Sequence, residues 1–440
     1  MKQRLATIFQ LGVPIMLAML SQSMINLVDA ALVGPLGEGA LAAVGAGSYA
    51  NFVALSLMTG LSAAVQAQVA RRVGAGRFDE CAMPTNHGLI IAFCFAMPVS
   101  IILVITSPWL LALFDQGSPT FKGDATDYFQ IRVMALTAAA MNLSFRGFWN
   151  GIGEPNGFLK LLVCTHICNV IFSFILIYGK LGLPALGVQG AALGTLLSMY
   201  LGALLNFRML NKRARKFGFL THWRNWPALK RLVLLAIPDS LQQTLFALGM
   251  MMLFAIVAQL GIREMAIAHV LMNTSLMLIL PGLGLGMAAN TLVSQSLGAR
   301  EPEVAWRWGQ EVMYTASAVL LVLSLPLIFT PEAVLSLFLH DPSLLAMGSI
   351  PMQLTGIGIV LDAPSLVFIQ ALLGAGANRT VLYIRFVAQW LILLPLCWLI
   401  GPVLGFGLTT VWSVPILQRM ITSVSFLVVW RSRRWSKVQI

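Results

Sequence analysis

Apolar segments of roughly 20 residues recur along the whole chain, and they constrain its fold more than any other feature. A segment of that length lets an α-helix cross a hydrocarbon core of about 30 Å. Of the 440 residues, 58% are hydrophobic and only 10% are charged, whereas charged residues make up about a quarter of an ordinary soluble domain. The sequence therefore predicts an all-α polytopic membrane protein without a water-soluble domain.

The apolar pattern predicts twelve transmembrane helices, and this even number places both termini on one side of the membrane. The expected spans are 8–33, 45–69, 88–109, 128–148, 158–178, 188–208, 230–258, 266–294, 311–331, 349–373, 381–400 and 406–430. About 23 of the 28 Lys and Arg residues then lie on the side of the termini, so the positive-inside rule predicts that both termini are cytoplasmic. The net charge of +12 is accordingly interpreted as a mark of membrane topology and not of nucleic-acid binding.

The sequence contains an internal repeat. Residues 60–77 read GLSAAVQAQVARRVGAGR and residues 284–301 read GLGMAANTLVSQSLGARE, and six positions are identical when position 60 is aligned with position 284. The same offset relates Pro14 to Pro238. Agreement between separate regions on one offset indicates that the chain is a duplication.

This duplication predicts an N-terminal six-helix bundle (1–208), a basic cytoplasmic linker (209–231) and a C-terminal six-helix bundle (232–440). Because six spans are an even number, both halves enter the membrane in the same orientation. Their pseudo-two-fold axis is therefore expected to lie along the membrane normal. Parallel repeats of this kind occur in secondary transporters, whose binding cavity lies between the bundles near mid-membrane.

The first span carries a polar stripe. Gln22, Asn26 and Asp29 follow one another at i, i+4 and i+7, so they share one face of the helix. An ionisable group in the membrane is costly, which makes it a functional candidate by default. The stripe predicts that Asp29 couples an ion and that Gln22 and Asn26 line the substrate cavity; the alternative is that Asp29 is a hydrogen-bonded structural acid.

Polar residues of other N-terminal spans are expected to meet Asp29. Asn169 and Ser173 of the fifth span lie at a similar depth, and Asn142 and Thr195 of the fourth and sixth spans would complete a polar pocket. A carboxylate held among these neutral groups could load and release a proton near physiological pH. These five residues form the predicted ion-coupling site.

The fifth span carries Cys164, His166 and Cys168, and the two cysteines share a helix face because residues at i and i+4 lie close together. A metal site is geometrically possible there, but small apolar cysteines are the commoner case in a membrane helix, so no metal is predicted. His166 is interpreted as a packing residue, with a proton-transfer role as the alternative.

The C-terminal half has its own polar candidates. Asp362 and Arg419 lie about a dozen residues from the ends of the tenth and twelfth spans, hence near mid-membrane. Unpaired charges there would be costly, so they are expected to neutralise each other, either as a structural pair or as a second polar site. Met252, in a methionine cluster, is a candidate for lining a promiscuous cavity. Asp239 is expected to cap or solvate a helix start.

Four motifs, together with the Gly-Ala-Gly loop after the second span, resemble the multidrug and toxic compound extrusion (MATE) family. They are NLVDAALVGPLG (26–37), RGFWNGIGEPN (146–156), GVQGAALGT (187–195) and LDAPSLVFIQALLGAG (361–376). The resemblance extends over the whole chain. The first motif and the arginine of the last span are most similar to the DinF-like branch.

The resemblance implies an antiporter of the inner (plasma) membrane that exports cationic or amphipathic small molecules, such as drugs or toxic metabolites. Protons or sodium would be the coupling ion, with no cofactor and no obligate protein partner. Asp29 matches the family's coupling aspartate, Asn142 and Asn169 match its polar partners, and Asp362 matches an aspartate of the tenth helix.

Two departures from the family pattern bear on the coupling ion. Ser173 stands where many DinF-like proteins have a second aspartate, and Phe246 stands where the NorM branch has a glutamate. Sodium favours several oxygen ligands whereas a proton needs one titrating group, so proton coupling is favoured and sodium coupling is the alternative.

Two other functional classes fit the sequence less well than an antiporter. A lipid-linked or polysaccharide flippase should line its cavity with several cations, but Arg419 is the only clearly mid-membrane base in the sequence. An intramembrane enzyme needs clustered nucleophiles, bases or metal ligands, and no HExxH or GxSxG motif occurs. The chain is therefore not expected to be an enzyme.

Overall fold

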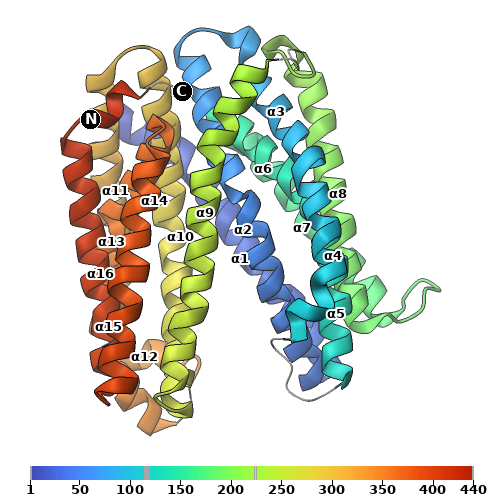
Figure 1. The fold of residues 1–440 in the computed structure, drawn as a ribbon, viewed down its shortest axis with the longest axis vertical. Coiled ribbons are helices and arrows are strands. Elements are labelled where there is room, and N and C mark those ends of the chain that lie inside the picture. The colour runs from blue at the N-terminus through green and yellow to red at the C-terminus, as the bar shows by residue number, and fades with distance from the viewer. Residues whose placement is uncertain (1, 113–118, 222, 224, 340, 439–440) are drawn as a thin grey trace. The chain divides into compact units, whose positions relative to one another are not determined.

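The fold consists of long helices joined by short loops (Figure 1). It is a computed structural model that describes residues 2–112, 119–221, 223, 225–339 and 341–438. Within these ranges there is no β-strand, and eleven helices are long and apolar enough to cross a membrane. The predicted all-α polytopic fold class is confirmed.

The helices form two compact units, one of Leu17–Ser240 and one of Met1–Met16 with Leu241–Ile440. The boundaries between them fall inside α1 and α9. The 209–231 segment, of which 222 and 224 are outside the described residues, belongs to the first of these units. The contacts thus divide the chain elsewhere than at the linker expected from the sequence. The division into two six-helix bundles stays a prediction.

The Leu17–Ser240 unit contains the second half of α1 and the first half of α9. Its helices are α1 (Lys2–Val33), α2 (Glu38–Gly74), α3 (Met83–Ile91), α4 (Met97–Ala112), α5 (Pro119–Met134), α6 (Leu136–Gly151), α7 (Pro155–Tyr178), α8 (Gly187–Arg213) and α9 (Trp226–Ala258). A π-helical segment, Ala92–Ala96, joins α3 to α4 into one continuous span.

The other unit contains the remaining parts of α1 and α9. Its further helices are α10 (Ile262–Gly298), α11 (Pro302–Phe329), α12 (Pro331–Leu335), α13 (Pro342–Ala375), α14 (Asn378–Phe386), α15 (Leu394–Trp398) and α16 (Leu408–Arg431). The π-helical segments Val387–Leu393 and Leu399–Val403 extend α14 and α15 into a single span. Helix α13 packs against α10, α11 and α16 and is the centre of this unit.

The predicted span 128–148 differs from the others, because the chain breaks there into α5 and α6 at Ala135. Two side chains cover the backbone carbonyls beside the break. The Ser100 hydroxyl donates to Val133 O at 2.8 Å, and the Tyr200 hydroxyl donates to Met134 O at 3.1 Å. A helix break within the membrane is tolerated where neighbouring side chains satisfy the freed backbone groups.

The internal repeat is visible as a repeated helix contact. In the Leu17–Ser240 unit, Gly60 of α2 lies against Ser240 of α9, and its amide donates to the Ser240 hydroxyl at 3.2 Å. In the other unit, Gly284 of α10 lies against Met16 of α1, and a Cβ at Gly284 would lie 3.0 Å from the Met16 Cα. The offset of the repeat aligns position 60 with position 284 and position 16 with position 240. The contact of Gly60 with α9 is therefore equivalent to the contact of Gly284 with α1.

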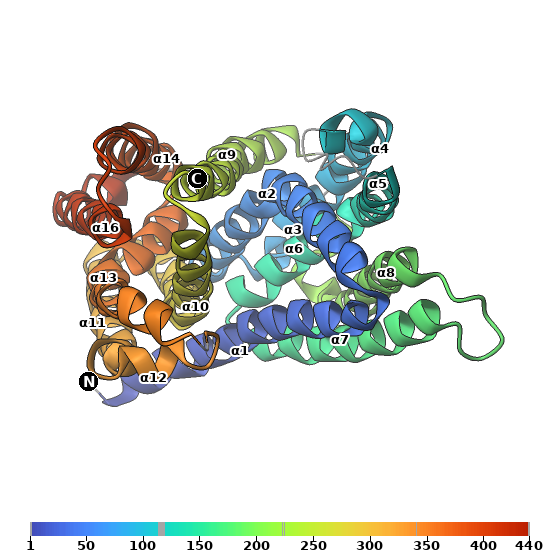
Figure 2. The same ribbon diagram turned by 90° about the horizontal axis from the view of Figure 1, so that it is seen from below.

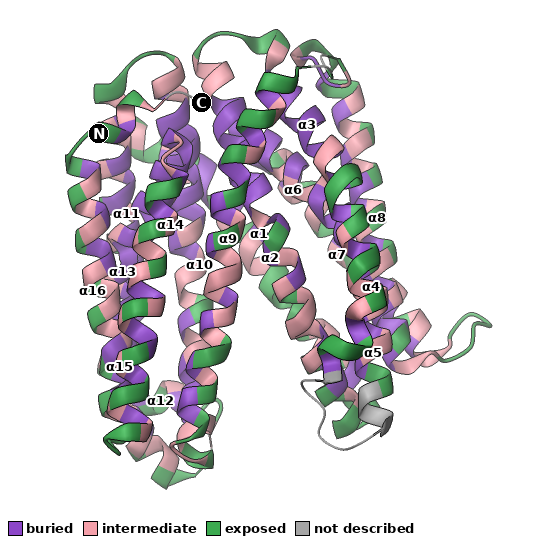
Figure 3. Ribbon diagram, in the orientation of Figure 1, coloured by how far each residue is buried: buried purple, intermediate pink, exposed green. Residues whose placement is uncertain are grey.

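These glycines begin the most deeply buried stretches of the two units. Every residue of 60–70 in α2 and of 284–294 in α10 is buried (Figure 3). Both stretches consist mainly of small residues, which let membrane helices approach closely. The two copies of the repeated sequence thus form equivalent buried helix segments, one in each unit.

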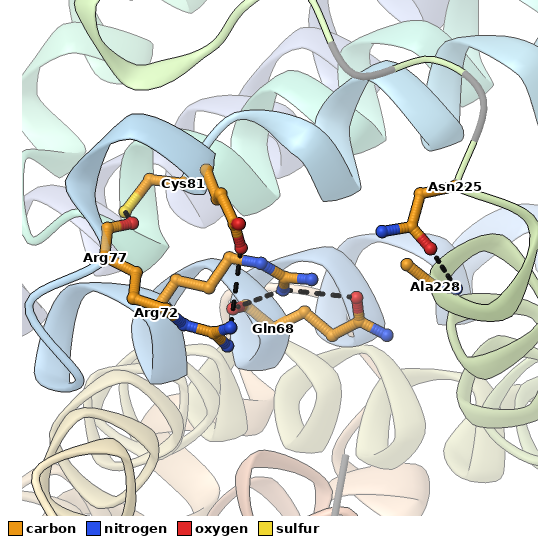
Figure 4. A network of polar contacts seen from close by, with 7 residues as sticks. Gln68, Arg72, Arg77, Cys81, Asn225 and Ala228 are labelled. Atoms are coloured by element: carbon orange, nitrogen blue, oxygen red, sulfur yellow. Dashed lines mark hydrogen bonds and ion pairs between the residues drawn. The ribbon is translucent and has the colours of Figure 1, made fainter.

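Polar contacts hold the loops at the end of α2 and at the start of α9 (Figure 4). The Arg72 guanidinium donates to the Gln68 carbonyl at 3.0 Å, and the Cys81 thiol donates to Arg77 O at 3.3 Å. Asn225 precedes α9, and its Oδ1 accepts from the Ala228 amide at 3.2 Å, as an N-cap residue does.

Candidate functional site

Glycines bring α7 and α8 into close contact along their length (Figure 1 and Figure 2). A Cβ on Gly190 would lie 2.6 Å from Leu176 O, and one on Gly202 would lie 2.7 Å from Thr165 Oγ1. Gly194, between them, lies directly against Ser173. Small residues at this kind of helical spacing permit the approach, which places the polar residues of the two helices within hydrogen-bonding reach.

Asn169 is the centre of a polar cluster on these two helices. Its Nδ2 donates to Thr195 Oγ1 at 3.1 Å and to Ser198 Oγ at 3.2 Å, and all three residues are buried. Its Oδ1 is buried as well, and no hydrogen-bond partner for it is found in the described part of the chain. The same holds for the buried Ser173 hydroxyl. The cluster therefore offers acceptor atoms that its own donors do not satisfy.

Asp29 lies in the second half of α1 and is half-buried. One of its carboxylate oxygens, Oδ1, is buried and has no hydrogen-bond partner within the described residues. The Arg132 guanidinium of α5 lies within electrostatic range of the carboxylate and packs over the Tyr128 ring, 5.8 Å from its centroid. Asp29 is therefore a sheltered acid with one cation nearby.

The end of α1 is anchored beside α7 and α8. The Tyr178 hydroxyl donates to Leu32 O at 2.7 Å, and Val33 belongs to a buried apolar cluster with Ile177 and Ala192. Asp29 thus lies one helical turn from residues that contact the two helices of the Asn169 cluster. A direct contact of Asp29 with that cluster is not among the hydrogen bonds between described residues, so the joint site stays a prediction.

Asn142 of α6 reaches α8 one residue beyond Ser198. Its Nδ2 donates to Met199 O at 3.1 Å, and its Oδ1 accepts from Asn206 Nδ2 at 3.5 Å. Asn142 therefore contacts α8 beside the Asn169 cluster, but its hydrogen bonds go to Met199 and Asn206 and not to members of the cluster.

The predicted cavity residues Gln22 and Asn26 are exposed on α1, and Met252 is exposed on α9. His166 has a partner, because its Nδ1 lies 2.6 Å from the Ser21 hydroxyl of α1. This hydrogen bond is consistent with the interpretation of His166 as a satisfied packing residue.

The two mid-membrane charges of the other unit have different neighbours. Arg419 of α16 donates through Nη2 to Ser275 Oγ of α10 at 2.8 Å, and its Nη1 is buried without a partner in the described ranges. Asp362 of α13 is buried, and Arg385 of α14 lies within electrostatic range of both. A direct Asp362–Arg419 ion pair is not found between described residues, so the expected neutralisation of the two charges stays a prediction.

Four residues near the predicted sites were missed in the sequence: Ser21, Arg132, Ser198 and Arg385. Charge counting assigned the arginines only to a side of the membrane, which ignores that a long side chain can extend from a helix end into the protein. Ser198 lies three residues after Thr195, on the same helix face, and this spacing would have revealed it. Within the described residues, no group of three His, Cys, Asp or Glu is placed to hold a metal ion.

Comparisons with known proteins agree with this architecture. A family model described as MatE matches the chain twice, over residues 14–175 and 238–399. The two matches begin at equivalent positions of the internal repeat, Pro14 and Pro238. The multidrug resistance protein NorM of Burkholderia vietnamiensis is 28% identical over 96% of this chain and 92% of its own length. The multidrug resistance protein MdtK of Yersinia pseudotuberculosis is 29% identical over 90% of this chain and 87% of its own length.

Solved structures share the fold. A crystal structure of MATE in complex with MaD3S has a TM-score of 0.87 at 22% identity, and an outward-facing conformation of a multidrug resistance MATE family transporter has a TM-score of 0.88 at 22% identity. Both comparisons cover 97% of this chain and 95% of the other. Because the family model matches well over half of its length, this chain belongs to the MatE family and is a multi-pass membrane transporter, not an enzyme.

Proposed function

We propose that the protein is a secondary antiporter that exports cationic or amphipathic small molecules in exchange for protons. Two of its relatives are named multidrug resistance proteins, and each matches this chain over nearly its whole length. An apolar transporter with few buried charges suits substrates that are largely apolar and carry one charge. The DinF-like branch, suggested by the motifs, is part of this proposal.

The observation that carries the proposal is the environment of Asp29. Its carboxylate is sheltered in a membrane helix, and its buried Oδ1 has no donor within the described residues. Protonation would remove the charge and turn the group into a donor. The unsatisfied Asn169 Oδ1 and Ser173 Oγ, on helices that contact the end of α1, are acceptors that such a donor suits. A proton would therefore change the hydrogen bonding of α1 as well as its charge.

Exchange follows if proton and substrate compete for Asp29. A cationic substrate favours the carboxylate, and a proton abolishes its charge, so each ligand weakens binding of the other. A ligand shifts a conformational equilibrium only by its difference in affinity for the two states. Proton entry from the outside would thus release substrate there, and the protonated transporter would return to the inward-facing state.

Sodium coupling is the alternative. A sodium ion requires several oxygen ligands, and Asp29 is the acid that the N-terminal half offers in a span, with Ser173 in place of a second aspartate. This favours the proton.

The proposal includes an orientation in the inner membrane with both termini in the cytoplasm. The basis is the excess of Lys and Arg on the side of the termini. A reporter fused to the C-terminus that is active only in the cytoplasm tests this: activity supports the orientation and inactivity contradicts it.

Substrate efflux from vesicles with an imposed pH gradient tests the coupling. Wild-type protein should drive efflux with a proton gradient and not with a sodium gradient, and Asp29→Asn should abolish the response. The matched control is Asp124→Asn, which removes an exposed carboxylate of α5 and should leave efflux unchanged. Full activity of Asp29→Asn would refute the coupling role, and efflux driven by sodium alone would favour the alternative.

A further inference from the structure

Five helices of the unit that contains Leu241–Ile440 converge on a cluster of charged and polar side chains. Arg419 lies at the middle of α16, about 17 Å from either end at 1.5 Å per residue. Its guanidinium donates to the Ser275 hydroxyl of α10. Its Nη1 is buried and without a partner in the described part of the chain. One guanidinium nitrogen is therefore held in place and another is left unsatisfied.

A second arginine faces the same place. Arg385 of α14 lies within electrostatic range of Arg419 and of Asp362. Its guanidinium carbon is 5.3 Å from the centre of the Phe246 ring of α9, in a cation–π arrangement. The Phe246 backbone is in turn fixed by Gln389, whose Nε2 donates to its carbonyl at 3.1 Å. The Phe246 ring, whose backbone is held by Gln389, thus helps to position this arginine.

The charges of this cluster do not balance. Arg385 and Arg419 contribute two positive charges and the buried Asp362 contributes one negative charge. In α10, α13, α14, α16 and the part of α9 that belongs to this unit (241–258), all of them described in full, the only other carboxylate is that of Glu264, in the first turn of α10. An uncompensated charge within a membrane is costly, and it normally serves a ligand or an ion pathway.

We infer that Arg419 and Arg385 form a binding site for the carboxylate of an amphipathic substrate. A guanidinium presents paired N–H donors in one plane, and this geometry matches the two oxygens of a carboxylate. A bound carboxylate would therefore accept a hydrogen bond from the unsatisfied Nη1 of Arg419. The cluster has a net charge of +1, which a ligand group with one negative charge would neutralise. The carboxylate of the nearby Asp362 would repel groups with two negative charges, such as phosphate monoesters. Arg385 and Arg419 are both partly exposed.

This inference rests on the proposed function and narrows its substrate class. Preferred substrates would then be amphipathic small molecules that carry a carboxylate.

Two rhodamine dyes that differ only in a free carboxylate and its methyl ester provide the probe. Their dissociation constants are measured by fluorescence polarisation with purified protein in detergent, without any ion gradient. Wild-type protein should bind the free acid more tightly than the ester. In Arg419→Gln and in Arg385→Gln this preference should fall about tenfold, while affinity for the ester stays within twofold.

Two further variants keep the test decisive. Ser275→Ala removes only the hydroxyl that orients Arg419, so it should reduce the preference partially even if an arginine variant does not fold. Arg431→Gln, at the exposed end of α16, is the matched control and should retain the full preference. Equal binding of acid and ester by wild-type protein, or an unchanged preference in Ser275→Ala and both arginine variants, would overturn the inference. Because no gradient is applied, this result is independent of whether Asp29 couples protons.

Discussion

Replacing Gly60 by alanine should destabilise the Leu17–Ser240 unit, although alanine is the better helix former. A Cβ at Gly60 would lie 2.5 Å from the backbone nitrogen of Ser240 and 2.7 Å from its hydroxyl, and it would also strike the Ala236 carbonyl. Backbone atoms of a packed helix cannot rotate away, so α2 and α9 must separate. Overpacking of this kind costs about 1–3 kcal/mol.

The magnitude follows from two opposing effects. Alanine stabilises a helix interior by about 0.5–1 kcal/mol relative to glycine, so the net destabilisation by Gly60→Ala should be about 1–2 kcal/mol. Gly284→Ala should cost less, because the nearest atom to its added Cβ is the Met16 Cγ at 2.5 Å, in a flexible side chain. Gly45→Ala, also in α2, meets nothing within 4 Å and should be neutral or stabilising.

Thermal unfolding of the three purified variants in the same detergent measures their relative stabilities. At about 2–4 °C per kcal/mol for a unit of this size, Gly60→Ala should lower the unfolding midpoint by several degrees and Gly45→Ala should not lower it. A Gly60→Ala midpoint equal to that of Gly45→Ala would show that α2 and α9 are not packed as described, and would refute the reasoning about the repeated contact.

Two other substitutions follow from the hydrogen bonds and ion pairs. Asn169→Ala removes the donor to Thr195 and Ser198 in a buried place, so it should cost about 1–3 kcal/mol, and an unchanged unfolding midpoint would contradict the cluster. The ion pair of Arg4 with Glu311 spans 2.7 Å, but the two side chains are 31% and 34% exposed, so solvent screens it. A double-mutant cycle with glutamine at both positions should give a coupling energy below about 1 kcal/mol that falls with added salt; a larger, salt-independent value would argue for a buried pair.

The fold was largely predictable because it follows from hydrophobicity and periodicity. Continuous apolar segments must form helices in a bilayer, where each backbone polar group has to be satisfied within the segment. The expected span 128–148 shows the limit of this rule. Composition cannot reveal that the chain breaks at Ala135, since the break depends on hydroxyl donors from Ser100 and Tyr200, which are distant in sequence.

The candidate site was predictable in part. The polarity of Asn169 and Thr195 within their spans predicted that both belong to one polar pocket, and the structure joins them by a hydrogen bond. The hydrogen-bond partner of Arg419 could not be predicted from the sequence. Its observed partner Ser275 lies 144 positions earlier in the chain, and no local pattern relates the two.

The sequence by itself determined the apolar and helical nature of the segments, the duplication that relates the segment after Gly60 to the segment after Gly284, and the few residues that carry charge into the membrane. These properties depend on the hydration of side chains and on helix periodicity, both of which are local. Only the tertiary structure decided that α1 and α9 each divide between two units, and that Arg385 joins Asp362 and Arg419. Those outcomes depend on which helix faces fit closely enough to bury their glycines, and this fit is a property of the packed helices together.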